Sequence, residues 1–121
     1  MKQVLAVAAG GAVGSVLRYL ISRLSFTTAF PWSTLIVNLA GSFILGLFLA
    51  VAGARFTLST ESKAFISVGL LGGFTTFSTF SQQTISLWQA DRFALAGWNV
   101  ALNLIVGLFA AWLGWRLGRM V

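Results

Sequence analysis

The chain has 121 residues, of which 58% are hydrophobic, and eight basic and two acidic residues carry its formal charge. A soluble domain of this length could not bury so much apolar surface, so the composition predicts an integral membrane protein with one domain, residues 1–121. The net charge of +6 does not indicate nucleic-acid binding, because the basic residues are scattered and mostly mark the ends of apolar runs.

Four apolar segments are long enough to cross a bilayer as helices. We predict them at residues 4–24, 32–54, 63–89 and 93–117. The first run continues well past the length of a signal peptide, so we expect it to be retained as a membrane helix. The predicted connections, residues 25–31, 55–62 and 90–92, are short. Neighbouring helices should therefore be antiparallel, with both termini and the middle loop on one side.

The basic residues give only a weak orientation signal. The side with the termini carries five of them, and the other side carries two or three: Lys2, Arg55, Lys63, Arg116 and Arg119 against Arg23, Arg92 and, less clearly, Arg18. So small a bias is compatible with insertion in both orientations, which would allow an antiparallel dimer, or with a modest preference for one.

Small and polar residues recur at helical spacing in three segments. In the first, Gly10, Gly11, Gly14 and Ser15 predict a close-packing face. The second and fourth segments each carry a stripe with i+4 steps: Thr34, Asn38, Ser42 and Gly46, then Asn99, Asn103, Gly107 and Ala111. Such asparagines either bond between helices or line a hydrated path, and the pattern leaves both open. Arg18 has two equal interpretations, a side chain snorkelling to lipid or a cation beside an anion vestibule.

The third segment contains the run GGFTTFSTFS at residues 72–81, which is unusual at membrane depth. Two glycines weaken a helix and the following hydroxyls can bond freed backbone groups, so we predict a break between Gly72 and Thr75. A break exposes carbonyls that suit a small cation and amides that suit an anion. Phe77 and Phe80 share a helical face, where they either pack or present positive ring edges to an anion.

Several kinds of chemistry are missing from the sequence. It contains no cysteine or histidine, and its two acids, Glu61 and Asp91, fall in predicted loops. Without a carboxylate inside a membrane span, proton-coupled export of cations is not expected, and an enzyme is not expected either.

The run at residues 72–81 resembles the signature of the small fluoride channels, the Fluc or CrcB family. The similarity extends to GSVLRY at residues 14–19, to TLIVNL at residues 34–39 and to Gly41. It implies an all-α fold of four transmembrane helices with a broken third helix, assembled as a dual-topology, antiparallel homodimer in the inner membrane. It further implies two fluoride pores per dimer and a structural sodium ion at the dimer centre.

The resemblance also assigns roles to individual residues. Phe77, Phe80 and Asn38 match pore residues, and Ser78 and Thr79 match a track of hydroxyls. The remaining matches are Gly72 and Thr75, whose carbonyls would hold Na⁺, and Arg18, which would lie near the vestibule.

Two positions depart from the family pattern. Gln83 stands where many members carry a glutamate, and Asn99 where some carry a tyrosine. We count Gln83, and Asn103 of the fourth segment, among the expected pore residues. The expected function is therefore passive, fluoride-selective export. A small coupled transporter is the alternative, and a non-conducting assembly protein is a further one.

Overall fold

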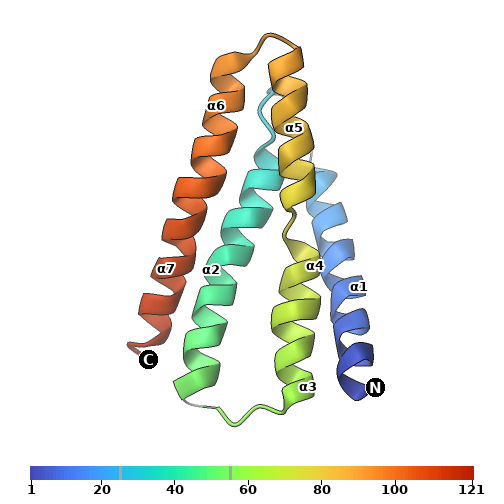
Figure 1. The fold of residues 1–121 in the computed structure, drawn as a ribbon, viewed down its shortest axis with the longest axis vertical. Helices are drawn as coiled ribbons and strands as arrows, with labels where there is room; N and C mark the ends of the chain where they lie inside the picture. The colour runs from blue at the N-terminus through green and yellow to red at the C-terminus, as the bar shows by residue number, and fades with distance from the viewer. Residues whose placement is uncertain (25, 55) are drawn as a thin grey trace.

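The computed structural model describes residues 1–24, 26–54 and 56–121. Four long helical stretches run up and down beside one another (Figure 1). Both termini lie at the same end as the connection between the second and third stretches, as the short loops predicted. Each stretch is long and apolar enough to cross a membrane. The predicted connections include Ser25 and Arg55, and the charge count includes Arg55; these two residues lie outside the described part of the chain.

The predicted segments correspond closely to the observed stretches. The first two are single helices, α1 (Lys2–Ser22) and α2 (Trp32–Ala54). The third consists of α3 (Thr60–Lys63), the π-helical segment η1 (Ala64–Leu71), α4 (Gly72–Phe74) and α5 (Phe77–Gln89). The fourth consists of α6 (Phe93–Ala101), the π-helical segment η2 (Leu102–Val106) and α7 (Gly107–Gly118).

The third stretch begins three residues before the predicted start because a serine caps it. The hydroxyl of Ser59 accepts a hydrogen bond from the backbone nitrogen of Ser62 at 3.1 Å, which satisfies one of the unpaired amides of the first turn. At its other end, the turn into α6 passes through Asp91 at a φ of 57°, a left-handed conformation that aspartate tolerates better than most residues.

Helix α1 packs along η1 and α4 through its glycines. A Cβ on Gly10 would lie 2.8 Å from the backbone nitrogen of Leu70, and one on Gly14 would lie 2.8 Å from that of Phe74. Only glycine permits so close an approach of two backbones. The predicted packing face of the first segment is therefore confirmed, and its partner is the third stretch.

Helix α2 packs against α7 in the same way, in the half of the molecule that contains the termini (Figure 1). A Cβ on Gly46 would lie 3.0 Å from the backbone nitrogen of Trp115, and one on Gly114 would lie 3.0 Å from that of Leu47. The small residues of the two stripes thus serve tight packing here, whereas their asparagines lie in the other half, at the break.

The third stretch is broken, as predicted, at the end of the predicted range, Gly72 to Thr75, and one residue beyond it. Gly72 has helical angles, φ −66° and ψ −38°, whereas Thr75 and Thr76 are extended. The glycine pair therefore does not form the break. Gly73 instead allows a close contact with α1, since a Cβ there would lie 2.8 Å from the carbonyl oxygen of Gly11.

Candidate functional site

The extended residues Thr75 and Thr76 separate α4 from α5 and interrupt the helical hydrogen bonds. Their angles are φ −77°, ψ 159° and φ −152°, ψ 115°. In a continuous helix the amides of Thr76, Phe77 and Thr79 would bond the carbonyls of Gly72, Gly73 and Thr75. Inside a membrane each freed group needs another partner, so the partners define this site.

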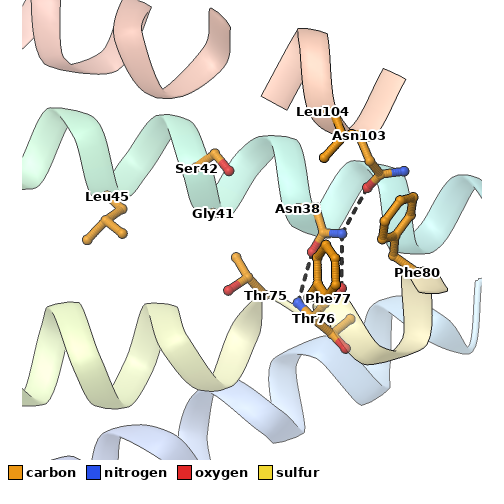
Figure 2. Close-up of a pocket in the computed structure, with 10 residues that line it drawn as sticks. All are labelled: Asn38, Gly41, Ser42, Leu45, Thr75, Thr76, Phe77, Phe80, Asn103 and Leu104. Carbon is orange, nitrogen blue, oxygen red and sulfur yellow. Dashed lines mark hydrogen bonds between the residues drawn. The ribbon is translucent and has the colours of Figure 1, made fainter. Parts of the chain in front are cut away.

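Asn38 of α2 bonds both backbone groups of Thr76. The amide nitrogen of Thr76 donates to Asn38 Oδ1 at 2.9 Å, and Asn38 Nδ2 donates to the carbonyl oxygen of Thr76 at 3.1 Å (Figure 2). The hydroxyl of Thr76 then caps α5 by accepting from the amide of Thr79 at 3.2 Å. One asparagine from a neighbouring helix thus replaces the hydrogen bonds that an uninterrupted helix would give Thr76.

Arg18 reaches the break from α1. Its Nε donates to the carbonyl oxygen of Gly73 at 3.2 Å, the carbonyl that Phe77 would bond in a continuous helix. A positive charge at the C-terminal end of a half-helix is favourable because the exposed carbonyls there are partially negative. Arg18 is thus directed toward the break, and its role beside an anion vestibule stays a prediction.

The contacts of Asn38, Thr76 and Arg18 described above provide no substitute hydrogen-bond donor for the carbonyls of Gly72 and Thr75. The amides that would bond them in a continuous helix, those of Thr76 and Thr79, bond Asn38 and the Thr76 hydroxyl instead. Across residues 1–24, 26–54 and 56–121, no group of three or more acidic, histidine or cysteine side chains is placed to hold a metal ion.

A first cavity, of about 240 Å³, lies between the break, α2 and η2 (Figure 2). It brings together five of the residues that the sequence singled out: Asn38, Thr75, Phe77, Phe80 and Asn103. The rings of Phe77 and Phe80 are in contact, with centroids 5.4 Å apart and planes inclined at 57°. Phe80 is buried at 6% exposure, whereas Phe77 is 72% exposed.

A second cavity, of about 430 Å³, is also lined by Thr76, so the break separates the two cavities. Arg18, Thr79 and Gln83 line it, together with further hydroxyl-bearing residues of α1 and α2. The Oε1 atom of Gln83 is buried and has no hydrogen-bond partner within the described part of the chain. This cavity therefore combines one positive charge, several hydroxyls and an unpaired amide oxygen.

Two of the expected site residues lie apart from these cavities. Gly72 and Ser78 are exposed and line neither one, although Ser78 Oγ lies 3.4 Å from Thr76 Oγ1. Gly72 lies before the break and Ser78 after it.

The sequence did not predict the role of Asn99 or Thr84. Asn99 is completely buried, at 0% exposure, and bonds both Asn103 and Thr84. The i+4 spacing of Asn99 and Asn103 gave a sign of this contact, but nothing in the sequence paired Asn99 with Thr84.

Known proteins are similar to this chain over most of its length. The family model described as "CrcB-like protein, Camphor Resistance (CrcB)" matches residues 5–115. A protein from Shewanella amazonensis named "Fluoride-specific ion channel FluC" is 52% identical over 120 residues, covering 97% of this chain and 96% of its own. Proteins of the same name from Thermus thermophilus and Agrobacterium fabrum are 47% and 43% identical, over 98% and 93% of this chain and 96% and 93% of their own.

Proposed function

Because this chain belongs to the CrcB-like family, whose relatives above are named fluoride-specific channels, we propose that it is a passive, fluoride-selective channel of the inner membrane. The structural observation that carries this proposal is the cavity at the helix break, where two phenylalanine rings meet the start of α5. The protein is a multi-pass membrane protein and not an enzyme.

The first cavity suits a small anion without giving it a fixed counter-charge. Aromatic rings carry a positive edge, and the first amides of a helix lack partners within that helix and carry partial positive charge. Phe77 and Phe80 supply the rings, and α5 begins at Phe77. Weak, distributed attraction lets an anion enter and leave, as conduction requires.

The second cavity would act as the vestibule on the other side of the break. Arg18 raises the local concentration of anions, and Thr79 and Gln83 offer polar groups on the way to Thr76. The proposed path follows the expected pore residues, with Asn38 and Asn103 beside the rings and Ser78 on the exposed face.

An antiparallel homodimer would complete this path. Phe77 is 72% exposed in the single chain, and Ser78 beside it is also exposed, so two proposed pore residues have little cover from the described part of their own chain. A second copy inserted in the opposite orientation would cover them and form two equivalent pores. The weak charge bias between the two sides is compatible with such double insertion.

The carbonyls of Gly72 and Thr75 would hold a sodium ion at the centre of that dimer. Both belong to the interrupted helix, their usual donors bond elsewhere, and carbonyls of an unwound helix are known ligands for Na⁺. When bound, the ion would neutralise the partial negative charge of the facing carbonyls. The positions of the acidic residues do not favour a proton-coupled transporter, which would need a carboxylate inside a membrane span. The described acidic residues lie at the ends of the spans, Glu61 in the first turn of α3 and Asp91 in the turn before α6.

Purified protein in liposomes loaded with potassium fluoride tests the proposal. After addition of valinomycin, a fluoride electrode should record rapid efflux without an imposed pH gradient, because the membrane voltage alone drives the anion. Matched liposomes loaded with potassium chloride should release almost nothing. Absence of fluoride efflux would refute the channel, and efflux that requires a proton gradient would favour a coupled transporter.

A further inference from the structure

A chain of hydrogen bonds leads from the break in the third stretch across α2 and the fourth stretch and back to α5. We call it the amide relay and define it as Thr76, Asn38, Asn103, Asn99 and Thr84. Asn38 Nδ2 donates to Asn103 Oδ1 at 2.9 Å, and Asn103 Nδ2 donates to Asn99 Oδ1 at 3.0 Å (Figure 2 shows the first of these). Asn99 Nδ2 then donates to Thr84 Oγ1 at 2.9 Å.

The sense of every bond in the amide relay is determined by its first member. The backbone nitrogen of Thr76 can only donate and its carbonyl can only accept, so the oxygen and nitrogen of Asn38 are assigned without ambiguity. Asn38 therefore presents a donor to Asn103. This fixes the amide of Asn103, and Asn103 in turn fixes that of Asn99. The hydroxyl proton of Thr84 is left to bond the carbonyl oxygen of Phe80, at 2.8 Å.

The amide protons of the two cavity asparagines are fully used inside the protein. Asn38 Nδ2 bonds the Thr76 carbonyl and Asn103 Oδ1, and Asn103 Nδ2 bonds both the carbonyl and the side-chain oxygen of Asn99. Each amide nitrogen has two protons, so neither has one free for an anion. While the amide relay is intact, these side chains shape the cavity but do not donate to its occupant.

The amide relay also connects the break to the backbone of Phe80, the buried ring of the proposed pore. It begins at Thr76, four residues before Phe80, and it ends on the carbonyl of Phe80 itself. Asn99 is its least accessible member, at 0% exposure, and lines neither cavity. Leaving a buried amide without a hydrogen-bond partner costs free energy, so the arrangement in which Asn99 is bonded to both neighbours is favoured over others.

We propose that Asn99, with Thr84, is a positioning residue of the channel: through the amide relay it holds Thr76 extended and keeps Phe80 in place for the anion. This inference deepens the proposed function and rests on it for its effect on flux. The prediction that the amide relay orders the break is independent of what the protein transports.

Substitutions at Thr84 give the sharpest test. Thr84→Val keeps the shape but cannot accept from Asn99, whereas Thr84→Ser keeps the hydroxyl and serves as the rescue variant. Ser86→Ala is the matched control, because the Ser86 hydroxyl also donates to a carbonyl four residues earlier, that of Gln82 at 3.0 Å, but lies outside the amide relay. Asn99→Leu, whose side chain has the same number of heavy atoms and the same branching, interrupts the amide relay at its buried member.

Two measurements on each purified variant decide the proposal: hydrogen–deuterium exchange of the Thr76 amide and fluoride efflux from liposomes. Loss of one buried hydrogen-bond partner should speed exchange at Thr76 about tenfold and lower efflux about tenfold in Thr84→Val and Asn99→Leu. Thr84→Ser and Ser86→Ala should match the wild type in both. Exchange in α1 should be the same in all variants, which shows that the fold is intact.

Unchanged exchange at Thr76 in Thr84→Val would show that the amide relay does not order the break. Faster exchange with unchanged efflux would show that it is only structural, and this too would overturn the positioning role. If Asn99→Leu fails to fold, the Thr84 pair still decides between these outcomes. If the wild-type protein itself shows no efflux, the proposed function fails, while the exchange comparison still decides whether the amide relay orders Thr76.

Discussion

Substitution of Gly14 by alanine should weaken the contact between α1 and the third stretch. A Cβ at this position would overlap the carbonyl oxygen of Leu70 and lie 2.8 Å from the backbone nitrogen of Phe74. Both are backbone atoms, so no change of side-chain rotamer can relieve the overlap. Helix α1 would have to move away from η1 and α4.

The size of the effect follows from the close packing of these helices. A gap of about 0.5–1 Å removes about a quarter to a half of the dispersion attraction between facing atoms, and overpacking of this kind typically costs about 1–3 kcal/mol. Alanine also favours a helix over glycine. Gly97→Ala measures that gain alone, because a Cβ there would meet no atom of the described residues within 4 Å. We expect Gly97→Ala to raise the free energy of unfolding by about 0.5 kcal/mol and Gly14→Ala to lower it by about 1–2 kcal/mol.

Unfolding by titration with sodium dodecyl sulfate in mixed micelles, followed by far-ultraviolet circular dichroism, measures both variants. Gly10→Ala offers an independent repeat, because its Cβ would overlap the carbonyl oxygen of Phe65. If Gly14→Ala proves as stable as Gly97→Ala, the two helices do not approach as closely as the structure has them. The hydrogen bond from Arg18 to Gly73 requires the same close approach of the helices, so its existence would also be contradicted.

Three further predictions concern the proposed channel. Phe77→Ile and Phe80→Ile should each slow fluoride efflux from liposomes about tenfold, because each removes a ring edge. Only Phe80→Ile should also lower the free energy of unfolding, because only Phe80 of the two is buried. Normal efflux in both variants would show that the rings merely pack. Replacing sodium by N-methyl-D-glucamine throughout purification should reduce the dimer fraction in gel filtration or the efflux rate, and indifference to sodium would remove the proposed carbonyl site. Arg18→Gln should lower efflux about fivefold at low ionic strength and less at high salt, because a vestibule charge acts through a field that salt screens. Arg18→Lys keeps the charge and should retain more of the efflux rate. Equal efflux rates in the Lys and Gln variants would contradict this role.

The helices could be predicted from hydropathy and the break from composition, but the cause of the break could not. The sequence indicated that Gly72 and Gly73 weaken the third helix, yet both are helical, and Gly73 serves the contact with α1. The extended residues are Thr75 and Thr76, and the partner that holds them is Asn38, 38 positions before Thr76. A contact of this kind depends on which helices lie side by side, and local propensity carries no such information.

The polar stripes of α2 and the fourth stretch show the same limit. Their i+4 spacing predicted either packing or a polar path, and the structure contains packing at one end and hydrogen bonding at the other. Gly46 lies against Ala111 and Trp115, while Asn38 bonds Asn103. Helix α2 packs mainly against α7, and this pairing determines which residues of the two stripes meet. Thr84 joins them only because α5 packs against α6.

The reversal potential of fluoride current in a planar bilayer tests the central claim most directly. With fluoride gradients across the membrane, chloride as the other anion and equal pH on both sides, a fluoride-selective passive channel should reverse at the fluoride equilibrium potential, shifting by about 59 mV per tenfold gradient. Changing the chloride or proton gradient should leave that potential where it is. A reversal potential that follows chloride, or one that moves with the pH gradient, would contradict the account.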